Sequence, residues 1–209
     1  MAWIERGAAA AALIAILNPA TASAKARACA VAQVEGENGR IWHDDASRPL
    51  AVGALPANGV VTIETGAATR AQIACDDGVV LTVGAESEID LEKLLGEAGA
   101  NENVLLRLLQ GVVGAVAPQR NWSRFDIETP FAIASVRSTE WLVGHASAEG
   151  SFAFVRKGAV TVEPRAGAAP VALESGEGVD VTPAGVVGPR AWPSARIEEI
   201  GARIGYGWR

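Results

Sequence analysis

Short runs of alternating hydrophobic and polar residues make up most of the chain, and turn residues separate them. Residues 60–64, 71–75 and 79–83 are short β-like runs next to turn signals, and this punctuation is typical of β-strands. The turns Glu-Asn-Gly at 37–39 and Asp-Asp-Gly at 76–78 predict a β-hairpin at each position. The pattern predicts an all-β fold, either a sandwich or roll or a solenoid-like stack of short antiparallel strands.

Two segments depart from this alternation. Residues 91–109 contain leucine-rich stretches that could begin a helix, but a polar interruption favours a strand, a loop and a second strand. Near the C-terminus, isoleucines recur at helical spacing over residues 197–204, so we expect a short helix that packs on the β core. Ser194 is its expected N-cap and Gly205 its expected stop.

The first residues have the pattern of a signal peptide. Arg6 precedes an apolar stretch over residues 7–17, and Ala22-Ser23-Ala24 offers a small-x-small cleavage site. The stretch is shorter than the roughly 20 residues that a membrane-spanning helix needs. We therefore expect export to the periplasm, cleavage after Ala24 and no membrane span in the mature chain. The chain is thus divided into a signal peptide (1–24), a β domain (25–190) and a C-terminal helical tail (191–209).

Cys29 and Cys75 are the two cysteines of the chain. An even number of cysteines in an oxidising compartment is consistent with one disulfide, which would join the start of the mature chain to an internal strand. Two buried free thiols are the alternative. Cys29 could also carry a lipid, although Arg27 fits poorly into the small or apolar sequence that precedes a lipidated cysteine.

Charge and composition narrow the class of partner. The formal net charge is −6, and 49% of the residues are hydrophobic. An acidic chain lacks the Lys/Arg surface that displaces counterions from nucleic acid. It also has no net electrostatic attraction to an anionic membrane surface. We therefore expect neither nucleic acid nor a membrane surface as partner. The 23 glycines and 10 prolines suit many strands separated by turns better than a helical bundle.

Few residues suggest catalysis or a cofactor. His43 and His145 are the two histidines, too few for an ordinary zinc site, and neither lies in a His-Glu-x-x-His pattern. The sequence also lacks a Gly-x-Ser-x-Gly elbow and a phosphate-binding loop. The carboxylate pair at Asp76-Asp77 fits a turn. We therefore expect no enzyme activity, no metal and no cofactor, since a hydrolase would need a pocket with convergent polar groups.

Tryptophans are the strongest candidates for binding. An exposed indole can contact a partner protein or a sugar ring, whereas a buried one closes the end of a β core. We expect Trp141 to be buried. The segment Arg120-Asn121-Trp122-Ser123-Arg124 is the best candidate for a surface contact with a partner, through Arg120, Trp122 and Arg124. The mature chain holds Trp42, Trp122, Trp141, Trp192 and Trp208.

The order of several short motifs along residues 31–187 resembles the FecR domain. The most specific piece is Thr129-Pro130 followed by Val136-Arg137-Ser138-Thr139, which resembles the family's Thr-Pro and Val-Arg-Gly-Thr-x-Phe signature. Each motif is weak alone, but their shared order makes the match specific. The central Leu-x-x-Gly-x-Val element corresponds to residues 106–113, and the closing Gly-x-Val and Leu-x-x-Gly-x-Gly strands correspond to residues 155–162 and 173–178.

The sequence departs from the family at two signature positions. Ser138 stands where the family usually has glycine, and Trp141 replaces the usual phenylalanine. If that glycine provides a positive φ, the loop at Ser138 must differ locally. Arg137 is a candidate structural residue that pairs with a carboxylate or with carbonyl groups.

The resemblance implies a binding module rather than an enzyme. The regulator that gives the family its name resembles a membrane-spanning anti-sigma factor, with a cytoplasmic segment before its helix. Only about six residues precede the apolar stretch here, so we do not expect sigma-factor binding. We expect a periplasmic module in envelope signalling or regulation that acts through a protein partner. The alternative is a polysaccharide- or peptidoglycan-binding module.

Overall fold

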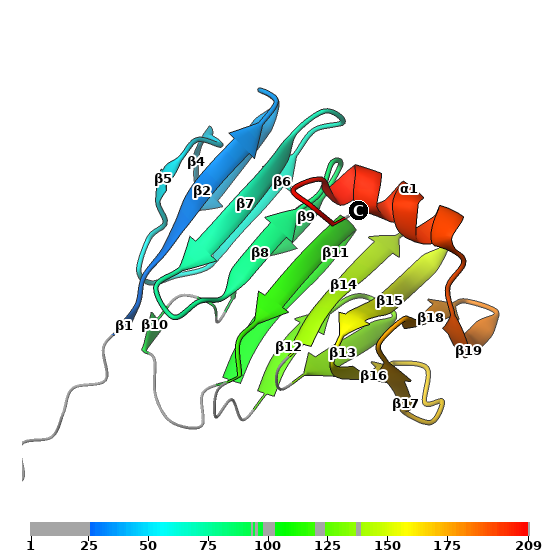
Figure 1. Ribbon diagram of the computed structural model, residues 1–209. Coiled ribbons are helices and arrows are strands. Elements are labelled where there is room, and N and C mark those ends of the chain that lie inside the picture. Colours follow the sequence, from blue (N-terminus) through cyan, green and yellow to red (C-terminus); the bar gives the residue numbers. More distant parts are fainter. Residues whose placement is uncertain are drawn as a thin grey trace, which may run out of the picture.

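Two β-sheets pack face to face, and one helix covers the outer side of one of them (Figure 1). This arrangement confirms the predicted all-β class and the short C-terminal helix. The predicted signal peptide (1–24) lies outside the described residues. Among the described residues, no helix has both the length and the hydrophobicity that crossing a bilayer requires. The computed structural model describes residues 26–92, 94, 96–97, 103–119, 124–136 and 139–208.

Sheet 1 lies beneath the helix, and its neighbouring strands are antiparallel. In spatial order its strands are β5 (Gly53–Ala54), β2 (Cys29–Glu35), β7 (Arg70–Cys75), β8 (Val80–Val83), the second half of β11 (Asn103–Ala117), β14 (Thr139–Ala146), β15 (Gly150–Lys157), β18 (Glu177–Thr182) and β19 (Gly185–Ala191).

Sheet 2 packs against sheet 1 and is antiparallel except for the parallel pair β11–β12. A separate short ladder joins β1 (Ala26–Arg27) to β10 (Gly96–Glu97). In spatial order the strands of sheet 2 are β4 (Ala46–Pro49), β3 (Gly39–His43), β6 (Val61–Thr65), β9 (Glu88–Asp90), the first half of β11, β12 (Arg124–Glu128), β13 (Ala132–Val136), β16 (Ala159–Pro164) and β17 (Val171–Glu174).

Strand β11 belongs to both sheets. Its first half pairs with β9 and β12, and its second half pairs with β8 and β14. The change of sheet occurs at Gly111, which has a φ of 89°. A Cβ at this position would lie 2.2 Å from Ser87 Oγ, and Ser87 Oγ accepts a hydrogen bond from the Val112 N–H. The glycine of the Leu-x-x-Gly-x-Val element is therefore required by the backbone.

The main core lies between the sheets, because alternate side chains of every long strand point inward. Aliphatic residues from both sheets fill it. Trp141 is fully buried there, as expected, and its ring meets Phe125 edge to face at 5.2 Å. The strand predicted near the end of residues 91–109 is also present, as part of β11.

A second apolar cluster lies on the outer side of sheet 1, under helix α1 (Ser194–Ile204). Trp192 stacks on Phe154 with ring centroids 5.0 Å apart. The helix ends as predicted at Gly205, whose N–H donates to the Gly201 carbonyl. The predicted N-cap is wrong by one residue: Pro193 occupies the cap and makes no side-chain cap bond, so Ser194 is already helical.

One of the two predicted hairpins is correct. Strands β7 and β8 pair around the turn at 76–78. The hairpin predicted at 37–39 is wrong, because β2 joins sheet 1 while β3 joins sheet 2. The turn there is held by other loops: the Asn38 N–H donates to Thr69 Oγ1 and the Asn38 carbonyl accepts from the Gly66 N–H. An Asn-Gly signal marks a turn but does not choose the partner strand.

Candidate functional site

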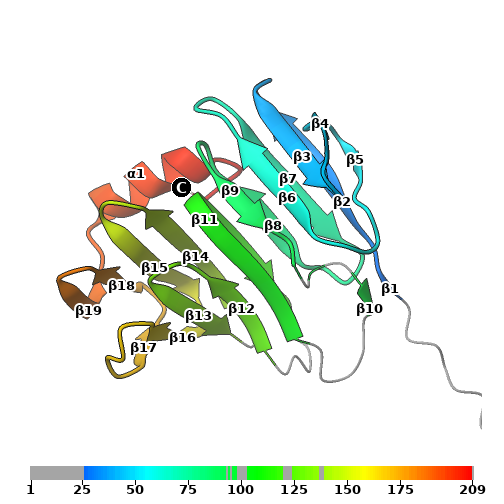
Figure 2. The same ribbon diagram turned by 180° about the vertical axis from the view of Figure 1, so that it is seen from behind.

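The outward side chains of sheet 2 form a broad surface, here called the outer face. Figure 2 shows this side of the molecule, and within the described residues no helix covers it. Strand β12 illustrates the alternation: Phe125 and Ile127 point into the core, while Arg124, Asp126 and Glu128 point outward. The outer face is therefore a direct product of the period-two pattern.

Ion pairs order the middle of the outer face. Asp90, Arg107 and Glu128 lie at matching positions on β9, β11 and β12. The Arg107 guanidinium contacts Glu92 at 3.1 Å and Glu128 at 3.4 Å. Arg165 contacts the same Glu128 carboxylate at 2.9 Å. The side chain of Arg107 is 48% exposed, so its position is fixed while much of its surface stays available to a partner.

Arg124, at the other end of β12 from Glu128, is anchored in the same way. It lies 3.0 Å from Asp126 and donates to Ser135 Oγ at 3.3 Å. Ser135 in turn donates to Asp126 at 2.7 Å, so one carboxylate holds two neighbours. The Arg124 side chain is 49% exposed. An arginine held by its own strand loses little conformational freedom when it binds.

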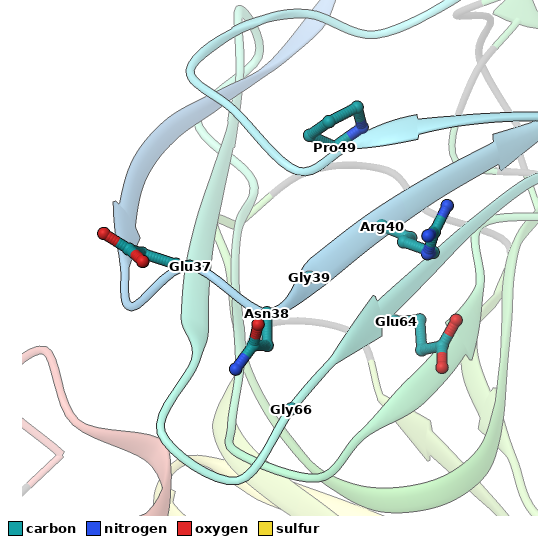
Figure 3. Close-up of a pocket in the computed structure, with 7 residues that line it drawn as sticks. All are labelled: Glu37, Asn38, Gly39, Arg40, Pro49, Glu64 and Gly66. Atoms are coloured by element: carbon teal, nitrogen blue, oxygen red, sulfur yellow. The ribbon is translucent and has the colours of Figure 1, made fainter.

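A hollow of about 430 Å³ opens at the other end of the outer face (Figure 3). Arg40 and Glu64 are cross-strand neighbours on β3 and β6, and both contribute side chains to it. Beside it, Trp42 is 40% exposed and its indole N–H donates to Glu64 Oε2 at 3.2 Å. The hollow is lined by Glu37, Asn38, Gly39, Arg40, Pro49, Glu64 and Gly66.

The residues predicted to contact a partner fall partly outside the described chain. Arg120 and Trp122 lie there, as do the signature residues Arg137 and Ser138. The described residues therefore do not test the predicted cluster as a unit. Arg124 is described, and it lies on the outer face.

The remaining signature residues have structural contacts. Thr129 Oγ1 accepts hydrogen bonds from the Ala132 N–H at 2.9 Å and from the Ser151 hydroxyl at 2.8 Å. With Pro130 it forms the turn between β12 and β13. Val136 is buried in the core, and Thr139 Oγ1 donates to the Ala159 carbonyl at 2.9 Å.

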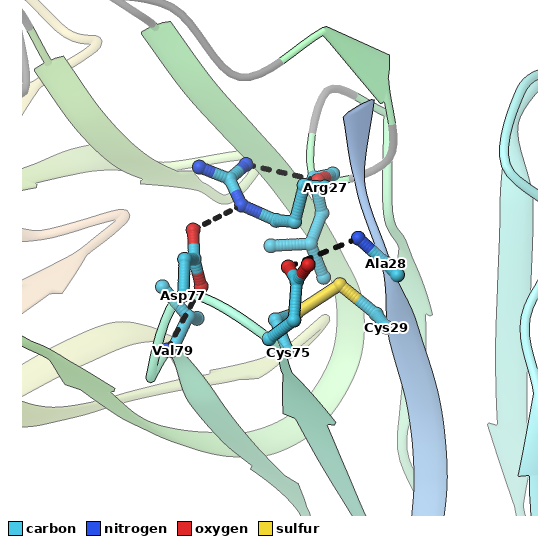
Figure 4. Close-up of a disulfide and its surroundings, with 8 residues drawn as sticks. Arg27, Ala28, Cys29, Cys75, Asp77 and Val79 are labelled. Atoms are coloured by element: carbon cyan, nitrogen blue, oxygen red, sulfur yellow. Dashed lines mark hydrogen bonds and ion pairs between the residues drawn. A yellow bond between two sulfur atoms is a disulfide. The ribbon is translucent and has the colours of Figure 1, made fainter. Parts of the chain in front are cut away.

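Cys29 and Cys75 form a disulfide between paired positions of β2 and β7 (Figure 4). The structure thus shows the bridge rather than free or lipidated thiols. Next to it, Arg27 is buried, forms an ion pair with Asp77 and donates to the Leu94 carbonyl at 2.9 Å. The beginning of the described chain is therefore fixed to the β7–β8 hairpin by covalent and polar contacts.

The two histidines have different environments. His43 Nε2 lies 3.0 Å from the Asn58 carbonyl at the surface. His145 is buried, and its Nδ1 lies 3.0 Å from both the Gly150 carbonyl and Ser151 Oγ. Burial lowers the pKa of His145 below 6.5, which favours the neutral ring. In the described part of the chain, no three His, Cys, Asp or Glu side chains gather as metal ligands would.

Sequence reasoning missed most of the outer face. Arg107, Glu128, Arg40 and Glu64 were not identified as site residues. Each occupies an outward position of an alternating strand, so the alternation could have placed them on a surface. It could not show that strands distant in sequence bring them together.

Part of the chain matches a known family, and its fold is similar to that of solved structures. Residues 61–161, from β6 to β16, match the model of the family described as FecR protein. No curated protein matches the chain. Two crystal structures of a protein from Parabacteroides distasonis ATCC 8503, described as a "putative anti-sigma factor", have a similar fold. Their TM-scores are 0.54 and 0.53, both at 16% identity, covering 69% and 68% of this chain and 74% of theirs.

The family match includes two central pieces of the resemblance, while the closing element at 173–178 lies outside it. The Leu-x-x-Gly-x-Val element at 106–113 and the Thr129-Pro130 turn both lie inside it. Their structural roles are distinct, since Gly111 allows β11 to change sheets and Thr129 organises the β12–β13 turn. Residues 61–161 therefore match the FecR family that the sequence motifs resemble.

Proposed function

We propose that the chain is a non-catalytic periplasmic interaction module that takes part in envelope signalling or regulation by binding a protein partner through the outer face. The observation that carries this proposal is the sheet face itself, free of helix within the described residues, on which Arg107 and Arg124 are held by ion pairs while about half exposed.

This surface suits a protein better than a small molecule. It extends over strands β3 to β17, and most of its outward side chains are charged or polar, so it is an open surface rather than an enclosed apolar cavity. Arginine is enriched where proteins bind one another, and fixed side chains reduce the entropy lost on association. Complementary charges on a partner would determine its orientation.

The family and the compartment support the same proposal. The FecR match and the fold shared with a protein described as a "putative anti-sigma factor" both favour regulation over catalysis. The apolar stretch at 7–17 and the Cys29–Cys75 disulfide favour export to an oxidising compartment. A partner would then be a protein of the envelope.

Site-specific photo-crosslinking in the native organism tests the proposal. A photo-reactive amino acid replaces Leu109, which is 39% exposed on the outer face, or Val187, which is 46% exposed on β19 of sheet 1. We expect position 109 to crosslink to one envelope protein and position 187 not to do so. Arg107→Glu and Arg124→Glu should each weaken the crosslink.

Two results would contradict the outer face as the docking surface. One is crosslinking of equal strength from both positions. The other is no crosslink from position 109, or one that is unchanged by both charge reversals. The far-ultraviolet circular dichroism of each variant serves as the folding control.

A further inference from the structure

We infer that the hollow beside Trp42 is a second binding site, which accepts a neutral, hydroxyl-rich ring such as one pyranose unit of a glycan. This inference goes beyond the proposed protein docking and rests on different residues. The hollow lies over β3, β4 and β6, whereas Arg124 lies on β12, with β9 and β11 between them.

The indole of Trp42 provides the apolar surface. Its N–H is held by Glu64 from the neighbouring strand, and 40% of the residue remains exposed. A large aromatic ring on a β-strand normally gains by burial, so an exposed one that is fixed by its polar edge offers a ready flat surface. The C–H face of a pyranose ring matches such a surface in size and polarity.

Planar polar groups stand next to this surface. In the described contacts, Arg40 uses one N–H to bind Ser47 Oγ at 3.1 Å, and a guanidinium has five N–H donors. Within the part of the chain that the structure describes, Glu64 accepts from Trp42 through Oε2, and its other oxygen can accept from a ligand. Figure 3 shows the side chains of Arg40 and Glu64 side by side on neighbouring strands. Two planar groups so placed can bind neighbouring hydroxyls as donor and acceptor.

The mixed charge of the hollow selects for a neutral ligand. Arg40 would repel an ammonium group, while Glu37 and Glu64 would repel a phosphate or a carboxylate. The Asn38 side chain adds an uncharged amide to the lining. The volume of about 430 Å³ falls within the range of about 300–1,000 Å³ that is usual for small-ligand sites. A sugar unit matches the hollow in charge, in size and in polarity.

Nuclear magnetic resonance of the oxidised, exported protein with ¹⁵N-labelled tryptophan tests this inference. Trp42→Phe identifies the Trp42 indole signal by its disappearance. The probes are glucose, N-acetylglucosamine and the β-1,4-linked trisaccharide of each, with lysine and inorganic phosphate as charged controls. We expect at least one saccharide to shift the Trp42 signal in a saturable way, and a trisaccharide to bind more tightly than its monomer if the natural ligand is a polymer.

Conservative variants separate binding from folding. Glu64→Gln should weaken saccharide binding by about tenfold, as expected for the loss of a charge-assisted hydrogen bond. Glu163→Gln is the matched control: it removes a carboxylate from the outer face at β16 and should leave saccharide binding unchanged. Arg124→Glu should also leave it unchanged, so this site and the protein docking surface can fail separately.

The inference is overturned if no saccharide shifts the Trp42 signal while the Glu163→Gln control is folded. It is also overturned if lysine or phosphate shifts that signal more strongly than the sugars do, or if Glu64→Gln binds saccharide as well as the unmodified protein.

Discussion

Protonation of the buried His145 ring should affect the stability of the fold. Its Nδ1 must carry the ring proton, because the Gly150 carbonyl 3.0 Å away can only accept. The Ser151 hydroxyl, also 3.0 Å from Nδ1, donates its hydrogen bond to Thr129 Oγ1 and can therefore only accept from Nδ1. Desolvation lowers the pKa of His145 in the folded protein below the 6.5 of a free histidine. The unfolded chain therefore takes up a proton at a higher pH than the folded one does.

The difference between the folded and unfolded pKa of His145 determines how the free energy of unfolding changes with pH. Well above pH 6.5 both states hold a neutral ring, and the full stability is present. As the pH falls below 6.5, the unfolded state is protonated first, so we expect the free energy of unfolding to decrease until the lowered pKa of folded His145 is reached. Urea titrations at pH 7.5 and pH 5.5 measure the decrease.

Two histidine variants separate this effect from other titrations. His145→Gln should lose part of the decrease between the two pH values, because the titrating ring is gone. His43→Gln should retain it, since His145 is still present. An identical decrease in all three proteins would show that His145 is not its source.

At the scale of single elements, alternation was sufficient to find strands but not to assemble them. The strand over residues 79–83 follows from its own sequence, a short apolar run that comes directly after a turn signal. The choice of sheet depends on distant contacts, such as Thr69 binding the Asn38 N–H, and the Glu-Asn-Gly turn was therefore misread as a hairpin. The same limit applies to the outer face, whose charged rows join residues from β9, β11 and β12.

Helix α1 was easier to predict because its isoleucines lie close together in sequence. Ile204 is fully buried against sheet 1. Ile204→Ala should lower the free energy of unfolding by about 2–4 kcal/mol, the usual cost of a cavity of this size. Glu198→Ala, on the exposed side of the same helix, should change it by less than about 0.5 kcal/mol. Chemical denaturation measures both, and equal effects would show that the helix does not depend on its apolar side.

At the scale of the whole molecule, the disulfide joins the beginning of the described chain to the interior of sheet 1. Its cysteines are 46 residues apart, and closing a loop of this length stabilises a fold by about 3–4 kcal/mol in the chain-entropy model. Reduction should therefore lower the urea midpoint of the native protein. The double variant Cys29→Ser and Cys75→Ser should start at the lower midpoint and show no response to reductant, and a response there would assign the effect to another cause.

The FecR domain matched by residues 61–161 begins after Cys29 and after strands β2 to β5. Those strands nevertheless complete both sheets, since β2 pairs with β7 and β3 pairs with β6. The sequence resemblance over residues 31–187 already included this segment, but it could not show that β2 joins one sheet and β3 the other. Trp42 and Arg40 lie on that segment, outside the matched residues.

The continuity of β11 through Gly111 has a consequence for communication across the molecule. Arg107 lies on the outer face, and five residues later Val112 supports helix α1 on the opposite side. Strand β11 thus carries both a residue of the outer face and a residue of the apolar cluster under helix α1. If a partner that binds Arg107 shifts β11, the order of helix α1 changes with occupancy and the coupling is reciprocal, so the helix would report binding on the far side of the fold.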